Sequence, residues 1–72
     1  MREKVIKLIE NILNLDEGTL KEDSKIEDVA GWDSLAHVLI VGEMEETLGI
    51  VIPLEEALEI TSLEELFEKA GI

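Results

Sequence analysis

The sequence predicts an all-α fold, a four-helix bundle with a long loop between the first and second helices and a short third helix. Apolar residues recur at helical spacing in the first segment, and good N-capping residues precede the second and fourth helices. The β-branched run Ile50–Ile52 is too short, and too close to Pro53, to found a sheet. A length of 72 residues allows a single domain, residues 1–72.

The first helix is expected over residues 2–14, because Val5, Leu8, Ile9 and Ile12 form one apolar stripe. No single period holds over 15–33, so this segment is expected to be a loop that Leu15, Leu20, Ile26 and Val29 attach to the core. So long a loop is unusual in a small domain and is often functional.

The second helix is expected over residues 34–48, with Asp33 as its N-cap and Gly49 as its end. Its apolar residues are spread widely around the helical wheel: Leu35, Val38, Leu39, Ile40, Val41, Met44 and Leu48. A helix that is apolar on so many sides is either central to the bundle or keeps a face for a partner.

A short third helix is expected over 55–59 and a fourth over 62–70, where Ser62 and Glu65 form a capping box. Leu63, Leu66, Phe67 and Ala70 form the inner stripe of the fourth helix. The expected core draws on all four helices: Val5, Leu8, Ile9, Ile12, Leu35, Val38, Ile52, Ala57, Ile60, Leu63 and Leu66.

The charge balance excludes several classes of function. With 6 basic and 18 acidic residues the net charge is −12, which argues against binding to nucleic acid or to anionic membranes and favours partners with basic patches. The absence of cysteine excludes disulfides, thiolate metal sites and a thiol nucleophile within the chain. No signal peptide or membrane span is recognisable, and we expect a soluble cytoplasmic protein without a dedicated metal site.

The stretch Gly31-Trp32-Asp33-Ser34-Leu35 is the most informative one for function. A serine directly after a capping aspartate stands exposed at the mouth of a helix, where an attached phosphate would meet free amides and a favourable dipole. The alternative is that Ser34 only helps to start the helix. His37 lies within reach as a base, but so short a chain offers little room for the oxyanion hole and substrate pocket of a serine hydrolase.

Asp33-Ser34-Leu35 resembles the phosphopantetheine attachment motif of acyl and peptidyl carrier proteins. Flanking segments also resemble the family, in order and over essentially the whole chain: Leu20–Val29, Glu45–Pro53, Glu55–Ala57 and Ile60–Leu63. A lone Asp-Ser-Leu is a weak signal, but these flanks at these spacings make it a specific one.

The resemblance implies a single carrier-protein domain and a freestanding, monomeric acyl carrier protein with an acyl-carrier-like bundle. A phosphopantetheinyl transferase would move 4′-phosphopantetheine from coenzyme A to Ser34, between the motif residues Asp33 and Leu35. The thiol of that group would carry acyl intermediates as thioesters for fatty-acid, polyketide or related lipid biosynthesis. The chain itself would not catalyse, and loading ligases, acyltransferases or synthases would supply the chemistry.

In this family partner enzymes dock on the second helix, and the positions that match the usual contact face are Asp33, Leu39, Gly42, Glu45 and Glu46. Ala36, Leu39 and Gly42 depart from the strongly acidic face of fatty-acid-type carriers, which favours partners other than the fatty-acid synthase itself.

Two residues beside the attachment motif are further candidates for partner contact. Tryptophan at position 32 is more typical of discrete carriers in secondary or surface-glycolipid biosynthesis and of peptidyl or D-alanyl carriers. Trp32 either packs over the loop or contacts the arm or a partner. His37 is expected to be exposed to solvent beside the arm.

Two alternatives stay open at this point. One is a peptidyl or D-alanyl carrier that an adenylating enzyme loads with an amino acid. The other is a helical adaptor that binds partners and is never modified. The first differs only in cargo, whereas the second would not need Ser34.

Overall fold

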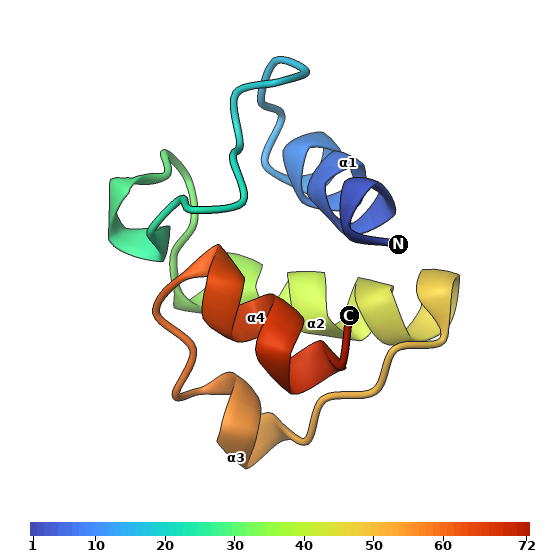
Figure 1. Cartoon of the computed structure of the whole chain (residues 1–72). Coiled ribbons are helices and arrows are strands. Elements are labelled where there is room, and N and C mark those ends of the chain that lie inside the picture. Colours follow the sequence, from blue (N-terminus) through green and yellow to red (C-terminus); the bar gives the residue numbers. More distant parts are fainter.

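The computed structural model describes residues 1–72 and contains no strand, only one isolated bridge between Lys25 and Ser62 (Figure 1). The all-α prediction is therefore confirmed. In chain order the elements are α1 (Arg2–Ile12), the 3-10 turn η1 (Ile26–Asp28), α2 (Ser34–Leu48), α3 (Leu54–Ala57) and α4 (Leu63–Ala70).

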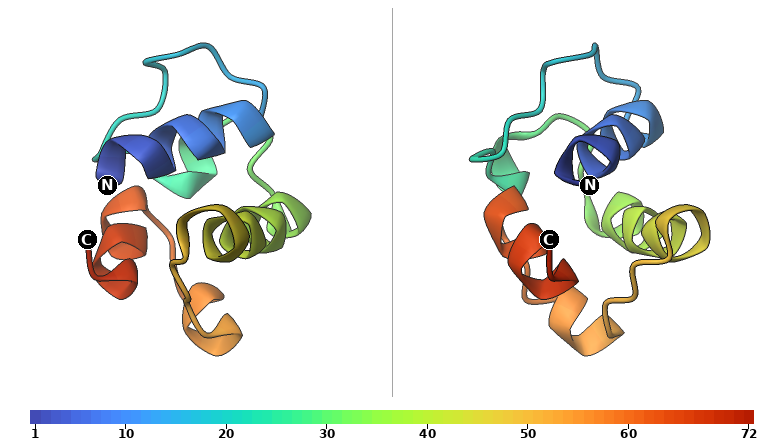
Figure 2. Two further views of the ribbon diagram at one scale, coloured as in Figure 1. Left: turned by 90° about the vertical axis from the view of Figure 1, so that its right-hand side faces the viewer. Right: turned by 45° about the vertical axis from the view of Figure 1, so that its right-hand side comes forward.

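The helices form a bundle in which α2 and α4 lie in the middle. All three ribbon views place α1 on one side of this pair and the short α3 on the opposite side (Figures 1 and 2). The bounds of α2 match the expected ones, whereas α1 ends two residues early and α3 spans only 54–57. Asn14, with φ of 57°, adopts the left-handed conformation that cannot continue a helix.

The core is aliphatic apart from two aromatic side chains, Phe67 and Trp32. Phe67, Ile9, Ile40 and Met44 are among its fully buried side chains. Seven of the expected core residues are confirmed as buried: Val5, Ile9, Ile52, Ala57, Ile60, Leu63 and Leu66. Leu8 and Ile12 are half-buried and pack against this core.

The prediction that Leu35 and Val38 belong to the core is wrong, since they are 80% and 49% exposed. The inward stripe of α2 consists of His37, Ile40, Val41 and Met44, which recur three or four residues apart. Because α2 is apolar on several sides, the periodicity did not tell which stripe faces inward.

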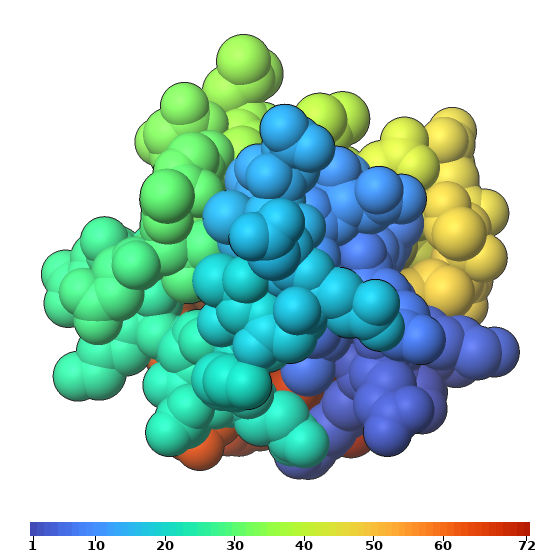
Figure 3. All heavy atoms as spheres, turned by 90° about the horizontal axis from the view of Figure 1, so that it is seen from above, coloured from blue at the N-terminus to red at the C-terminus, as the bar shows by residue number.

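The loop between α1 and α2 is fixed at both ends. The buried carboxylate of Glu10 accepts hydrogen bonds from the backbone N–H groups of Gly18 and Leu20, each at 3.0 Å. At the other end the Ile26 N–H donates to Thr61 O at 3.0 Å. Figure 3 shows the first part of the loop lying against α1.

Apolar side chains also attach the loop to the core. Leu20 is buried, and Ile26 and Val29 are half-buried and pack against the core, which confirms their expected role. Leu15 is also half-buried, over a groove beneath the loop. These contacts hold the loop against the core, and the loop in turn leads to the start of α2.

Candidate functional site

Ser34 is the first residue of α2, and the turn before it holds it at the surface. Gly31, with φ of 83°, reverses the chain before this turn. Asp33 caps the helix as expected, because its Oδ1 accepts a hydrogen bond from the Ala36 N–H at 2.8 Å. Since Asp33 is the cap, the exposed hydroxyl of Ser34 is left free for modification.

This turn fits the phosphate end of a phosphopantetheine group. The first N–H groups of an α-helix lack an acceptor within the helix, and those of Ser34 and Leu35 lie next to the hydroxyl. No acidic residue lies in the first turn of α2 itself, so the capping carboxylate of Asp33 is the only negative group at the positive end of the helix dipole. A phosphate ester on Ser34 would meet both features.

An apolar pocket of about 340 Å³ opens directly beside Ser34. The α2 side chains of Ser34, His37 and Val38 form one side of it. The rest of its wall comes from η1, the turn before α2 and the segment after α3: Ile26, Trp32, Asp33, Leu58 and Ile60.

Two of the lining residues, Trp32 and His37, form a buried hydrogen-bonded pair. The Trp32 indole N–H donates to His37 Nδ1 at 3.0 Å, and His37 Nε2 lies 2.7 Å from Ala57 O. An indole N–H can only donate, so Nδ1 must be the acceptor and Nε2 carries the proton that it donates to Ala57 O. The pair therefore joins the turn before Ser34 to α2 and to α3.

The expectation that His37 is exposed to solvent is wrong, because its side chain is buried at 9% exposure. Trp32 is 7% exposed and packs in the core cluster. Both nitrogens of His37 are engaged, so neither is free to take a proton from Ser34. An isolated histidine in an apolar helix carries no periodic signal, which is why the sequence did not reveal its burial.

The expected partner-facing residues of α2 lie together on its outer surface. Leu39 is 52% exposed, and Gly42, Glu45 and Glu46 are exposed as well. With Val38 and Glu43 they line one shallow groove. Apart from its chain neighbours and the backbone of its own helix, nothing lies within 4 Å of the position that a Cβ of Gly42 would take, so a partner can approach the backbone there.

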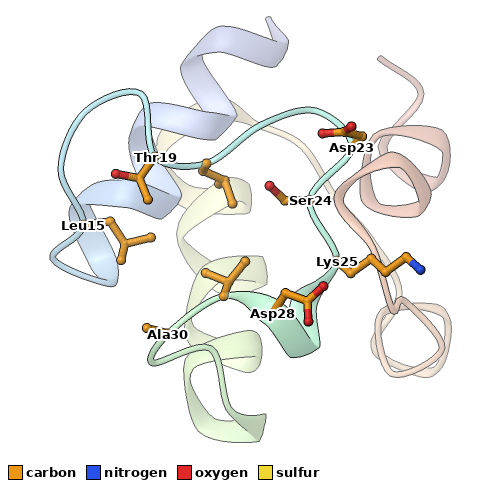
Figure 4. Close-up of a pocket in the computed structure, with 9 residues that line it drawn as sticks. Leu15, Thr19, Asp23, Ser24, Lys25, Asp28 and Ala30 are labelled. Carbon is orange, nitrogen blue, oxygen red and sulfur yellow. The ribbon is translucent and has the colours of Figure 1, made fainter.

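A second groove of about 480 Å³ lies beneath the loop between α1 and α2 (Figure 4). It contains none of the expected site residues and was not foreseen. Its lining mixes apolar with polar and charged side chains: Leu15, Thr19, Leu20, Asp23, Ser24, Lys25, Asp28, Val29 and Ala30.

No three His, Cys, Asp or Glu side chains come together anywhere as potential metal ligands.

The helices include none with both the length and the apolar character that crossing a bilayer requires. The longest, α2, has 15 residues.

Comparison with known proteins agrees with the geometry of the Ser34 turn. The family model described as "Phosphopantetheine attachment site" matches residues 3–69. An acyl carrier protein of Syntrophobacter fumaroxidans is 31% identical over 68 residues, which cover 94% of this chain and 84% of that protein. No solved structure matches the chain. The chain therefore belongs to the acyl carrier protein family, whose members bear a covalently attached phosphopantetheine group.

Proposed function

We propose that this chain is a freestanding acyl carrier protein and that Ser34 is its attachment residue. The observation that carries the proposal is the exposed Ser34 hydroxyl at the N-terminus of α2, within a chain that matches the family from residue 3 to 69. The attached thiol would carry acyl groups as thioesters between enzymes of fatty-acid, polyketide or related lipid biosynthesis. The chain would present its cargo and leave catalysis to its partners.

Modification would use Ser34 as the nucleophile. Its Oγ would form a bond to the phosphorus of coenzyme A that adjoins pantetheine, and the pyrophosphate bond would break with release of adenosine 3′,5′-bisphosphate. The transferase would take the hydroxyl proton, because His37 has no free nitrogen. Asp33 would keep the helix start in shape, and the 80% exposed Leu35 would offer the transferase an apolar contact.

The groove on α2 would be the docking surface for partner enzymes. Leu39 and Gly42 supply its apolar part, and Glu45 and Glu46 supply negative charge at one end. This pattern fits an enzyme surface with an apolar centre and a basic rim, since complementary charge speeds encounter and orients the two proteins. Trp32 and His37, which lie beneath the surface, would act on docking by holding the start of α2 in place.

The nature of the cargo is the point on which acyl and aminoacyl carriers differ. The pocket beside Ser34 is largely apolar, which favours an acyl carrier. An adenylating enzyme that charges the modified protein with amino acids but with no acyl acid would instead make it a peptidyl or D-alanyl carrier. We also propose that the protein acts in the cytoplasm.

Intact mass measurement tests the attachment. The protein is incubated with coenzyme A and a broad-specificity phosphopantetheinyl transferase, and we expect a gain of one phosphopantetheine. Ser34→Ala should abolish the gain, whereas Ser24→Ala, which changes a loop serine, should keep it. A folded wild-type protein that gains no mass with a competent transferase would contradict the proposal and leave an unmodified adaptor.

A further inference from the structure

We propose that His37 is the positioning residue of the turn that presents Ser34, and that it holds this turn only while its imidazole is neutral. Protonation of His37 would release Trp32 and loosen the turn. This inference rests on the proposed attachment at Ser34 and adds an acid-sensitive control of that attachment.

The first argument is the place of His37 between two elements. Its Nδ1 accepts the indole N–H of Trp32, two residues before Ser34, and its Nε2 donates to Ala57 O at the end of α3. The bond to Ala57 is the only hydrogen bond between α2 and α3. One buried ring thus connects the start of α2 both to the preceding turn and to α3.

The second argument is that the Ser34 turn is bonded to the same part of α2. Asp33 Oδ1 accepts from the Ala36 N–H at 2.8 Å, and Asp33 O accepts from the His37 N–H at 2.9 Å. Trp32 directly precedes Asp33, so a displacement of the indole acts on both bonds of the cap. The Ser34 hydroxyl lies between them in the sequence and would lose its fixed position.

The third argument is the number of hydrogens that the pair can hold. A neutral imidazole has one donor and one acceptor, whereas both nitrogens of an imidazolium donate. After protonation the His37 Nδ1–H and the Trp32 indole N–H would face each other across the present 3.0 Å. Both side chains are buried, and a buried donor without an acceptor is costly, so the pair would have to separate. The bond from Nε2 to Ala57 O can persist in either state, so the change falls on the side of Trp32.

The charged groups around His37 include one that could imitate this effect. Asp33 is the only other ionisable side chain in the lining of the pocket that His37 shares with Ser34. Its protonation would also loosen the turn, so the test must remove its titration. Glu10 is the only other buried ionisable side chain, and its carboxylate is bonded to loop amides. The acidic residues of η1, of α3 and of the segment after α3 are all exposed: Glu27, Asp28, Glu55, Glu56 and Glu59.

Nuclear magnetic resonance of the unmodified full chain gives the first test. The protein is titrated from about pH 8 to about pH 5, the range in which histidine changes its charge. At the upper end we expect the His37 ring to carry its proton on Nε2 and the Trp32 indole N–H to exchange slowly. As the ring gains its second proton, the indole N–H should exchange faster, and the amide signals of Ser34 and Ala36 should shift with the same midpoint.

Two variants assign this transition. Asp33→Asn keeps an oxygen at the cap without a titrating group, so the transition should remain. Trp32→Phe removes the indole N–H, so His37 can gain a proton without a conflict and the amide signals of the turn should no longer follow it. A wild-type ring that titrates while the indole and the turn stay unchanged would overturn the proposal. A folded wild type whose ring stays neutral down to about pH 5 would overturn it too.

The rate of mass gain with the transferase gives the second test. An asparagine at position 37 places its amide oxygen near the position of Nδ1, whereas a glutamine places its amide nitrogen near that of Nε2. His37→Asn should therefore retain the modification rate at neutral pH. His37→Gln, which keeps a donor for Ala57 O but leaves Trp32 without its acceptor, should be slower by roughly fivefold, the factor for one lost hydrogen bond.

The pH dependence of the same rates completes the test. Each wild-type rate is divided by the rate of His37→Asn at the same pH, so the pH dependence of the transferase cancels. We expect this ratio to fall on acidification. A constant ratio, or equal neutral rates for His37→Asn and His37→Gln, would overturn the positioning role. No mass gain in any of the proteins would instead overturn the attachment at Ser34, while the titration of the unmodified chain still reports on the turn.

Discussion

Helices α2 and α4 lie side by side in the middle of the bundle, yet they use their apolar residues differently. In α4 Leu63, Leu66 and Phe67 are fully buried, and the acidic residues occupy the other faces. In α2 Ile40 and Met44 are fully buried, but three large apolar residues stay exposed: Leu35, Val38 and Leu39. The bundle needs only one apolar stripe from each helix, so the surplus on α2 is available for binding.

The two helices also differ in the electrostatics of their first turns. Glu64 and Glu65 stand in the first turn of α4 and offset the positive end of its dipole. The first turn of α2 has no acidic residue, and its cap is the preceding Asp33. The start of α4 thus carries two acidic side chains after its serine cap, whereas the only acidic group at the start of α2 is the capping carboxylate of Asp33, so an added anion meets less like charge there. This difference supports Ser34 as the bearer of a phosphate.

The largest expected effect separates the two faces of α2. Ile40→Ala should lower the free energy of unfolding by about 2–5 kcal/mol, because it leaves a cavity in the core. Leu39→Ala, at the adjacent exposed position, should change it by less than about 0.5 kcal/mol. Urea unfolding of both variants measures the difference. Similar losses for the two would show that Leu39 packs in the fold and would remove the argument for a surplus face.

The converse effect is expected in partner binding. Leu39→Ala should weaken docking of a partner enzyme by about 1–2 kcal/mol, or roughly 5–30-fold in affinity, if Leu39 is the apolar centre of the interface. Val51→Ala, which truncates a still more exposed apolar side chain outside α2 (65% against 52% for Leu39), should leave affinity unchanged. Calorimetry with the transferase or a loading enzyme measures both. A loss with Val51→Ala but not with Leu39→Ala would move the interface away from α2.

The caps of the two helices give the next effect. Asp33→Ala and Ser62→Ala should each cost about 1 kcal/mol of stability, because each cap accepts a hydrogen bond from its first turn. Only Asp33→Ala should also slow modification of Ser34, measured as the rate of mass gain with the transferase. Equal slowing by Ser62→Ala would indicate that the loss of stability, and not the shape of the Ser34 turn, controls modification.

The sequence predicted the local features better than the long-range ones. Asp33, Gly49, Ser62 and Gly71 marked the helix ends correctly, because capping depends on the residues of a single turn. The inward face of α2 was not predictable, since an evenly apolar helix has no preferred side until its neighbours are in place.

In the candidate site, too, the sequence predicted a local feature and missed a long-range one. Ser34 was found from its motif, and its exposed position at a helix start agrees with that interpretation. The link from Trp32 through His37 to Ala57 was not found, because it joins residues 20 positions apart in the sequence. Buried polar pairs of this kind depend on tertiary packing and leave no pattern in a single sequence.

Charge pairing should make the protein sensitive to salt. Lys69 of α4 lies 3.8 Å from Glu56 and 3.9 Å from Glu59, whereas α2 has three acidic residues and no lysine or arginine. At a net charge of −12 the folded state repels itself, so added salt or Mg²⁺ should raise the melting temperature by screening. Thermal unfolding at several salt concentrations measures this, and a falling trend would mean that the few ion pairs outweigh the repulsion.

The smallest expected effect concerns the start of α4. Two hydrogen bonds from Thr61 lower the pKa of Glu65 below its usual value of 4.5. The bond from the Thr61 hydroxyl has the larger effect and the bond from its backbone N–H the smaller one. Because the folded state stabilises the charged carboxylate of Glu65, the two hydrogen bonds add to the free energy of unfolding at pH values above the unfolded pKa. This contribution is lost as the pH falls through the lowered folded pKa.

Glu65→Gln should therefore be less stable than the wild type at neutral pH, and the two should converge as the pH falls below 4.5 and through the lowered pKa of Glu65. Urea unfolding at a series of pH values measures the convergence. Glu64→Gln, one residue away in the same turn, controls for the loss of a charge near the helix dipole. If the two variants follow the same pH profile, the dipole accounts for the effect and the bonds to Thr61 add nothing. A pH profile specific to Glu65 would show that a carboxylate within the first turn of α4 stabilises that turn. In α2 the corresponding carboxylate is that of Asp33, which precedes the helix.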